Sequence, residues 1–259
     1  MRLRILGCGG STGVPLLSGE PGGYWGDCDP AEPRNRRTRA SVLVSEGDAR
    51  VLIDTSPDLR EQLLAAGDAR LTGVVYTHGH ADHLHGIDEL RSVNHVVNGP
   101  LPVYADATTM AEIERRFGYV FAPMNNPRIW YKPKLIPHVI DGPFQLGGIT
   151  FQPFRQDHGY GNHSLGFRFG DMAYSTDCKA LDEAAFAVLA GVRVWVVDCV
   201  RVEEHPTHSH LAQTLEWITR LKPERAILTH MNQTLDYARL KATLPPGVEP
   251  GFDGLEVVV

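Results

Sequence analysis

The chain has 259 residues, of which 42% are hydrophobic and 22% are charged, and its formal net charge at pH 7 is -6. This length and hydrophobic content predict one globular domain that spans residues 1–259. The acidic balance disfavours a protein that coats nucleic acids or membranes nonspecifically, so we expect neither a stable nucleic-acid partner nor a membrane partner.

Short β-rich segments recur along the chain and are separated by segments with helical periodicity. The expected strands cover residues 3–6, 41–44, 51–53, 74–76, 165–169, 172–174, 194–197, 226–228 and 255–259. The expected helices cover residues 57–66, 108–117, 181–190, 211–221 and 235–243.

The order of these elements predicts the fold class. The chain opens with several strands before its first helix, whereas strands and helices alternate in its second half. This order favours an α/β fold in which two sheets pack face to face with helices outside, rather than one doubly wound sheet. Residues 16–39 are rich in Gly, Pro and Arg, and residues 118–143 are rich in Pro and aromatic residues. Neither segment fits a strand or helix pattern, so we expect both to be loops that wall a pocket.

Residues 77–83 carry the strongest functional signal, Thr-His-Gly-His-Ala-Asp-His, directly after the apolar run 73–76. Residues i and i+2 at a strand end point the same way, so His78 and His80 can bind one metal ion. Asp82 and His83 follow a small residue, where the chain can turn into a helix and reach a second ion. A polar loop rich in His is the alternative, but the spacing is that of a ligand motif.

Three later residues extend this constellation, because His158, Asp177 and His230 each follow an apolar strand. Each alone could be an ordinary polar residue at a strand end, but together they predict one metal centre. Asp177 would bridge two ions, and each ion would also be held by its own set of three residues. The two sets are His78, His80 and His158 for the first ion, and Asp82, His83 and His230 for the second.

The ligand chemistry predicts two divalent metal ions per chain. Nitrogen and oxygen ligands without thiolate suit Zn²⁺, Mn²⁺ or Fe²⁺, and the sequence does not choose among them. A hydroxide between two ions about 3.5–4 Å apart is a nucleophile at neutral pH. Asp54, which follows the run 51–53, is a candidate to accept the free ring N–H of a ligand His. An exposed turn residue is the alternative for Asp54.

The motif at residues 77–83, followed by His158, Asp177 and His230, resembles the metallo-β-lactamase superfamily over nearly the whole chain. This resemblance implies a four-layer αββα sandwich with a dinuclear metal site. It is closest to the phosphodiesterase branch, which includes tRNA 3′-processing ribonucleases and phosphoribosyl 1,2-cyclic phosphate phosphodiesterase. In that branch a catalytic His precedes the last ligand, and here His208 stands 22 positions before His230.

The resemblance implies hydrolysis of a small sugar or nucleotide phosphodiester, either cyclic or linear. A hydroxide that bridges the two metals would attack phosphorus, and His208 would protonate the leaving alkoxide as general acid, with Asp82 taking part in proton transfer. Arg91 and His210 are candidate substrate contacts. Arginines in residues 34–39 could meet a second phosphate, and aromatic residues in 117–131 could cap a base. A solvated loop and core packing are the alternatives for these two segments.

The sequence departs from the cyclic phosphodiesterase in one respect. That enzyme holds a structural zinc with cysteines in its first long loop and a His just after the last ligand. Here the loop keeps only Cys28, and Asn232 and Gln233 follow His230. We therefore do not expect this structural zinc.

Three other functions remain open: a thioester or lactone hydrolase, a tRNA 3′-processing ribonuclease, and a non-catalytic nucleotide-binding protein. His208 disfavours the first, the lack of a long basic arm disfavours the second, and the complete ligand set disfavours the third. The N-terminal segment is typical of a strand rather than a signal peptide, and the four cysteines are scattered. We therefore expect a reduced, cytoplasmic protein, and the resemblance implies a homodimer.

Overall fold

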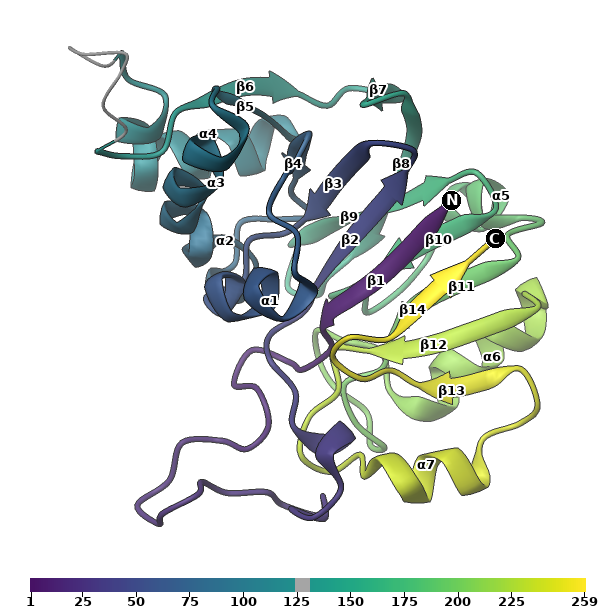
Figure 1. The fold of residues 1–259 in the computed structure, drawn as a ribbon. Helices are drawn as coiled ribbons and strands as arrows, with labels where there is room; N and C mark the ends of the chain where they lie inside the picture. Colours follow the sequence, from purple (N-terminus) through teal and green to yellow (C-terminus); the bar gives the residue numbers. More distant parts are fainter. Residues whose placement is uncertain (124–130) are drawn as a thin grey trace.

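A computed structural model of the chain describes residues 1–123 and 131–259. In this part of the chain the strands form two sheets of seven strands each. The helices lie outside the sheets, with α1 to α4 beside the first sheet and α5 to α7 beside the second (Figure 1). Their bounds are α1 Leu59–Ala66, α2 Ala81–Leu84, α3 Leu90–Val97, α4 Ala107–Phe117, α5 Glu183–Leu189, α6 Leu211–Leu221 and α7 Tyr237–Thr243, with short 3-10 helices at Pro33–Asn35, His85–Glu89 and Gly118–Val120. The predicted αββα sandwich is confirmed.

The first sheet is antiparallel at one end and parallel at the other. Its strands lie in the order β14 (Glu256–Val258), β1 (Arg2–Gly7), β2 (Ser41–Glu46), β3 (Ala49–Ile53), β4 (Gly73–Val75), β5 (Leu101–Ala105) and β6 (Leu135–Val139). Strands β3 to β6 pair in parallel. The carboxyl ends of β3 and β4 therefore lie at one edge, where Asp54 and the 77–83 motif follow them.

The second sheet has the same mixed character. Its strands lie in the order β13 (Val248–Pro250), β12 (Arg225–Thr229), β11 (Val194–Asp198), β10 (Met172–Ser175), β9 (His163–Phe169), β8 (Ile149–Asp157) and β7 (Phe144–Leu146). Strands β10 to β13 pair in parallel, so the residues that follow β10, β11 and β12 also share one edge.

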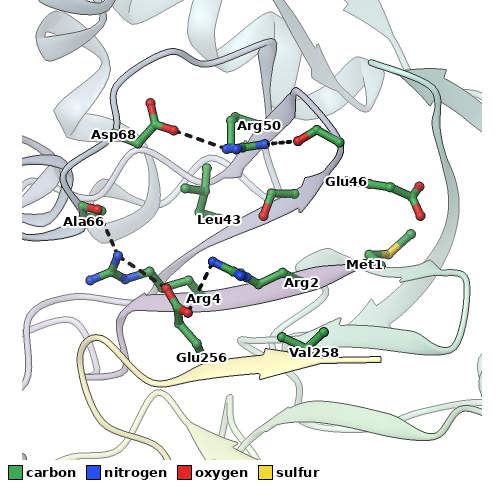
Figure 2. A pocket seen from close by; sticks show the side chains of 12 residues that line it. Met1, Arg2, Arg4, Leu43, Glu46, Arg50, Ala66, Asp68, Glu256 and Val258 are labelled. Carbon is green, nitrogen blue, oxygen red and sulfur yellow. Dashed lines mark hydrogen bonds and ion pairs between the residues drawn. The ribbon is translucent and has the colours of Figure 1, made fainter.

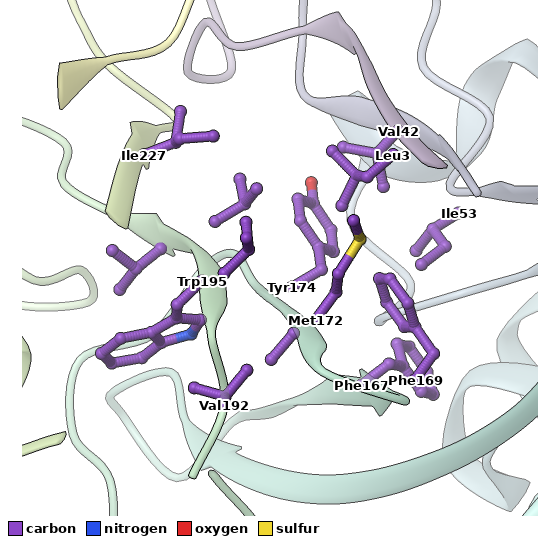
Figure 3. Close-up of a cluster of buried hydrophobic side chains, with 14 of the residues drawn as sticks. Leu3, Val42, Ile53, Phe167, Phe169, Met172, Tyr174, Val192, Trp195 and Ile227 are labelled. Carbon is purple, nitrogen blue, oxygen red and sulfur yellow. The ribbon is translucent and has the colours of Figure 1, made fainter. Parts of the chain in front are cut away.

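Apolar side chains from both sheets form one core between them (Figure 3). Leu3 and Ile53 come from the first sheet, and Phe169, Met172 and Tyr174 from the second, and all five are fully buried. Burial of apolar and aromatic surface is the main favourable term in folding. This core therefore fixes the position of one sheet against the other, and with it the strand ends that carry the predicted ligands.

The expected strands and helices are present, with shifts at their ends and several additions. Two helices begin two residues later than predicted because Asp182 and Asp236 cap them, each accepting a hydrogen bond from a backbone N–H three residues on. The segment 118–143, expected to be a loop, contains β6, which pairs with β5. Helix α3 and strands β5, β7 and β13 were not predicted.

The first long loop is attached to the segment after His230 by a buried arginine. The side chain of Arg37 is almost fully buried, with a relative exposure of 1%. Its guanidinium donates to the carbonyl oxygens of Asn232 at 3.0 Å and Leu235 at 2.6 Å, and lies 3.8 Å from the sulfur of Cys28. The loop around Cys28 is thus held by an arginine.

No helix in the described part of the chain is long and apolar enough to cross a membrane.

Candidate metal centre

The 77–83 motif leaves β4 as extended chain and then becomes helical. His80 has extended backbone angles at the N-cap of α2, and Asp82 and His83 lie within that helix. The predicted turn into a helix after the second His is confirmed. The motif thereby projects two side chains from the segment before the helix and two from the helix toward the same edge of the sandwich.

The seven predicted ligands converge in two groups that share Asp177. Within each group, the potential ligand atoms all lie within 4.8 Å of one another. The groups are His78, His80, His158 and Asp177, and Asp82, His83, Asp177 and His230. This is the grouping that the sequence predicts. That these residues bind metal stays a prediction.

The carboxylate of Asp177 faces both groups. Its Oδ1 lies 3.0 Å from Nε2 of His83 and 3.2 Å from Nε2 of His230. Its Oδ2 lies 3.5 Å from Nε2 of His158 and 3.6 Å from Nε2 of His78. One oxygen is therefore directed at each group, as a bridging ligand requires.

The donor set fits a pair of divalent cations. Nε2 of His78 is buried without a hydrogen-bond partner in the described structure. A buried polar atom without a partner costs free energy, and a cation among the donor atoms would remove that cost. Burial and the nearby His83 lower the pKa of His78, which favours the neutral imidazole that binds metal.

Three side chains in this region leave their strands with left-handed backbone. The φ angles are 66° at Asp54, 53° at Asp177 and 58° at His230. Such angles are uncommon outside glycine, and Asp and His are among the residues that adopt them most readily. The chain thus turns sharply at each strand end, which directs these side chains into the cluster.

Asp54 supports the cluster from behind, as predicted. Its Oδ2 lies 2.8 Å from Nδ1 of His83, which leaves Nε2 of that ring for a metal. Thr77 donates two hydrogen bonds to the carboxylate of Asp54, from its backbone N–H at 2.8 Å and from its hydroxyl at 2.7 Å. Asp54 is fully buried, so the alternative of an exposed turn residue is wrong. On the other side, Nδ1 of His158 lies 2.8 Å from the carbonyl oxygen of Thr207.

His208 lies against both the bridging carboxylate and a predicted ligand. Its ring stacks on His230 with centroids 4.7 Å apart, and its Nε2 is 3.8 Å from Oδ2 of Asp177. Its Nδ1 is 3.5 Å from Oδ2 of Asp198. Burial lowers the pKa of His208, but the carboxylates of Asp198 and Asp177 outweigh burial and raise this pKa to about 9.

Asp198 was not among the site residues predicted from the sequence. It ends β11, and its Oδ2 accepts hydrogen bonds from the backbone N–H groups of Ser209 at 3.0 Å and Cys178 at 3.3 Å. These bonds hold the carboxylate beside His208. The signal was present, because Asp198 follows an apolar strand just as Asp177 and His230 do.

Gly159 allows the loop that carries His208 to approach the β8–β9 turn. A Cβ at Gly159 would lie 2.5 Å from the carbonyl oxygen of Pro206 and 3.0 Å from Cα of Thr207. The φ angle of Gly159 is also positive, at 75°. Only glycine tolerates both conditions, so this position brings the His158 and His208 segments together.

A cavity of about 550 Å³ opens beside the first group of predicted ligands. Its walls come from the motif, from α4 and from the β8–β9 turn, and include His163. Nε2 of His163 lies 2.7 Å from Oδ2 of Asp106, the N-cap residue of α4.

The predicted substrate contacts are not brought into this cavity. Arg91 is exposed on α3, with Nη1 3.5 Å from the carbonyl oxygen of Tyr131. His210 is the N-cap residue of α6, and its buried Nδ1 has no partner in the described structure. Both roles stay predictions. In the aromatic segment 117–131, Trp130 lies outside the described residues.

The arginines of residues 34–39 are largely engaged by other side chains. Arg34 pairs with Glu32 at 2.7 Å, and Arg39 pairs with Asp58 at 2.9 Å. Arg37 is the buried residue described above. A contact between this segment and a second phosphate has no support in these pairings.

A separate hollow of about 420 Å³ lies over β1, β2 and β14 (Figure 2). Its arginines are already paired: Arg2 and Arg4 each lie 3.5 Å from Glu256, and Arg50 lies 3.2 Å from Asp68. None of the predicted ligands lines it. The candidate site is therefore the cluster at the strand ends.

Residues 49–231 match the beta-lactamase superfamily domain. The chain belongs to the beta-lactamase superfamily. A crystal structure described as a new diphosphatase from the PhnP family is 33% identical, with a TM-score of 0.89, and the alignment covers 100% of this chain and 97% of that chain. This similarity confirms the predicted resemblance to the branch of the superfamily that includes phosphoribosyl 1,2-cyclic phosphate phosphodiesterase.

Other proteins similar to this chain bear different names. An octanoyltransferase of Porphyromonas gingivalis (strain ATCC BAA-308 / W83) is 35% identical over 263 residues, which cover 100% of this chain and 52% of that protein. The chain thus spans about half the length of this relative. A ribonuclease Z of Bradyrhizobium sp. (strain ORS 278) is 42% identical over 62 residues, 23% of this chain and 21% of that protein.

Zn²⁺-bound PqqB from Methylobacterium extorquens has a TM-score of 0.74 at 19% identity, with 100% of both chains covered, and shares the fold. Together with the cluster of His and Asp, membership of the superfamily supports a metal-dependent hydrolase that binds divalent metal.

Proposed function

We propose that this chain is a phosphodiesterase that uses two divalent cations, Zn²⁺ or Mn²⁺, to hydrolyse a small sugar or nucleotide phosphodiester, cyclic or linear. The observation that carries the proposal is Asp177, whose two oxygens face two groups of ligand atoms while His208 lies beside the same carboxylate. When bound, two such ions supply a water of lowered pKa and neutralise charge that develops on the phosphoryl oxygens.

Residues of the chain would supply the proton that the leaving group gains. Hydrolysis joins the oxygen of water to phosphorus and breaks the bond to the leaving oxygen, which must gain a proton. His208 would donate it from Nε2, which faces the cluster, while Asp198 orients the ring through Nδ1. Asp82, 3.4 Å from Nε2 of His230, would act as a ligand and assist proton transfer.

The replacement His208→Ala tests this assignment. An alkyl leaving group needs a general acid more than p-nitrophenolate does, because an alkoxide is far more basic. We expect the variant to lose about 10²–10⁴-fold in kcat on an alkyl diester and less on bis-p-nitrophenyl phosphate. Metal analysis should find two ions in the variant, as in the wild type.

His205→Ala is a matched control, because His205 lies 5.0 Å from the ring of His208 but belongs to neither group of predicted ligands. It should retain nearly full activity. Loss of metal and fold together in His208→Ala, or equal losses on both substrates, would contradict the general-acid role.

Hydrolysis of a diphosphate is a second candidate, favoured by the full-length similarity to the PhnP-family diphosphatase structure. The same residues would act on a P–O–P bond. A panel of cyclic ribose phosphates, 2′,3′- and 3′,5′-cyclic nucleotides and nucleoside diphosphate esters separates the two candidates. Faster turnover of a thioester or a lactone than of every phosphate ester would overturn both.

A further inference from the structure

Three buried side chains behind the metal cluster each have one polar atom that the proposed mechanism leaves without a hydrogen bond. These atoms are Oδ1 of Asp198, Nδ1 of His208 and Nδ1 of His230. The relative exposures of the three residues are 0%, 9% and 2%. A buried polar atom without a partner costs free energy, so three such atoms on neighbouring side chains indicate a place for a further ligand.

The three side chains face one another at separations that suit a small cation. Nδ1 of His230 lies 3.8 Å from Oδ1 of Asp198, and Nδ1 of His208 lies 3.5 Å from Oδ2 of the same carboxylate. One potential ligand atom of each residue lies within 4.8 Å of the other two. These separations are long for hydrogen bonds but close to the spacing of about 3.3 Å between donor atoms around a tetrahedral zinc ion.

The carboxylate of Asp198 is held so that one oxygen remains available. Its Oδ2 accepts hydrogen bonds from the backbone N–H groups of Ser209 at 3.0 Å and Cys178 at 3.3 Å. Its Oδ1 accepts none in the described structure. One carboxylate oxygen and two imidazole nitrogens are a common ligand set of zinc, whereas manganese prefers a set richer in oxygen.

We infer that Asp198, His208 and His230 form a third, inhibitory site for Zn²⁺ beside the two predicted groups. A zinc ion there would replace the protons on Nδ1 of both rings, and these protons would pass to solvent. His208 bound through Nδ1 would no longer be an imidazolium, so it could not donate the proton that the leaving group needs. The inhibition rests on the proposed function, whereas binding of the third ion does not.

Zinc analysis after equilibrium dialysis tests the site without requiring turnover. We expect two ions per wild-type chain at low free Zn²⁺ and a third at a concentration about 100-fold higher, because protons compete for its nitrogen ligands. Anomalous diffraction at the zinc edge should place this third ion between the three side chains.

The variants Asp198→Asn and His208→Ala should each hold two ions at both zinc concentrations. In Asp198→Asn the amide oxygen can keep the hydrogen bonds of Oδ2, which directs the amide NH₂ at the cation and preserves the fold. His208→Ala removes a different ligand and guards against a defect peculiar to the first variant. His205→Ala is the matched control and should hold three ions, because His205 lies 5.0 Å from the ring of His208 but outside the group.

Excess Zn²⁺ should reproduce the effect of removing His208. The wild-type rate on an alkyl diester should fall toward the loss of about 10²–10⁴-fold expected for a missing general acid, with a smaller loss on bis-p-nitrophenyl phosphate. The residual rate of His208→Ala should change by less than about twofold, because that variant has no acid to lose. Excess Mn²⁺ should not inhibit the wild type.

Two ions per wild-type chain at every zinc concentration would overturn the inference. So would a third ion that persists in both Asp198→Asn and His208→Ala, because that ion would lie elsewhere. Equal inhibition of both diesters would overturn the inhibitory role. A third ion that both variants lose, in a protein that hydrolyses no diester, would instead overturn the proposed function alone.

Discussion

The carboxylate of Asp54 contacts three polar groups at once, two of Thr77 and the ring of His83. Burial raises the pKa of Asp54, whereas the charge of His83 and the hydrogen bonds oppose that rise. Asp54 therefore does not touch the cleft but sets the orientation of a ring that does. This arrangement makes it a positioning residue whose effect is measurable through metal affinity.

The replacement Asp54→Asn should lower metal affinity by about 10–100-fold, because the acceptor for the ring N–H of His83 is weakened. Asn tolerates the left-handed backbone at this position, so the fold should persist. Metal titration followed by calorimetry measures the effect. Asp68→Asn, which removes surface ion pairs, is the control and should bind metal as the wild type does. Equal affinities in both variants would contradict the assigned role.

Asp253 links the C-terminal segment to two earlier parts of the chain. Its Oδ1 accepts from the backbone N–H of Cys8 at 3.0 Å, and its Oδ2 accepts from the backbone N–H and hydroxyl of Thr38 at 2.8 Å and 2.7 Å. Burial raises the pKa of Asp253 from 3.8 to about 6, against the effect of these hydrogen bonds.

This raised pKa predicts a pH-dependent contribution to stability. The folded state binds the proton more tightly than the unfolded state, so the contribution is full below pH 4 and is lost as the pH rises through about 6. Asp253→Asn cannot titrate. Between pH 4 and pH 7, the free energy of unfolding of the wild type should fall by about 2 kcal/mol relative to the variant. Parallel pH profiles from urea unfolding would show that the pKa is not raised.

The loop that contains Arg37 is attached to the segment after His230 by several hydrogen bonds. Asn35 donates to Asp236 at 2.7 Å and accepts from the backbone N–H of Tyr237 at 2.7 Å, and Arg37 adds two further bonds. The buried guanidinium supplies two hydrogen bonds to carbonyl oxygens, a buried one to Leu235 and a partly buried one to Asn232. Arg37→Ala should reduce the free energy of unfolding by about 2–4 kcal/mol, because it leaves these acceptors without donors. Urea unfolding measures the loss. Arg36→Ala, at an exposed position, should change stability by less than about 0.5 kcal/mol, and similar losses in both would contradict this role for Arg37.

The predicted ligands could be found from the sequence because each follows an apolar strand, and the carboxyl ends of parallel strands meet at one edge. Asp198 obeys the same rule and was open to the same reasoning. His163 could not be found by this reasoning, because it begins a strand rather than following one. Its contact is with Asp106, which lies 57 positions earlier. Contacts over such separations are set by tertiary packing alone.

The missed elements of the fold have a similar cause. Strand β6 contains Pro137 and has no alternation that marks it as a strand, yet its pairing with β5 gives it an extended conformation. The αββα layering was predictable, because the order of strands and helices along the chain limits how the layers can form.

The predicted ligands come from both halves of the sandwich. His78, His80, Asp82 and His83 follow a strand of the first sheet, whereas His158, Asp177 and His230 follow strands of the second. Each group in the cluster contains residues from both sheets. Metal binding should therefore stabilise the packing of one sheet on the other as well as the site itself.

Removal of metal should lower the melting temperature. A ligand present at 100 times its Kd contributes about 2.7 kcal/mol to the free energy of unfolding, and for a chain of this size that corresponds to roughly 5–10 °C. Differential scanning calorimetry with and without a chelator measures the shift, and added Zn²⁺ or Mn²⁺ should reverse it. Identical melting temperatures in both forms would contradict metal binding between the sheets.

The packing of the core shown in Figure 3 should therefore affect the geometry of the predicted metal site. If one layer slides over the other by a fraction of an ångström, every nitrogen on one side of the cleft shifts together against every donor on the opposite side. Substitutions of tightly packed aromatic side chains, remote from any reacting atom, should therefore alter cation selectivity before they unfold the protein.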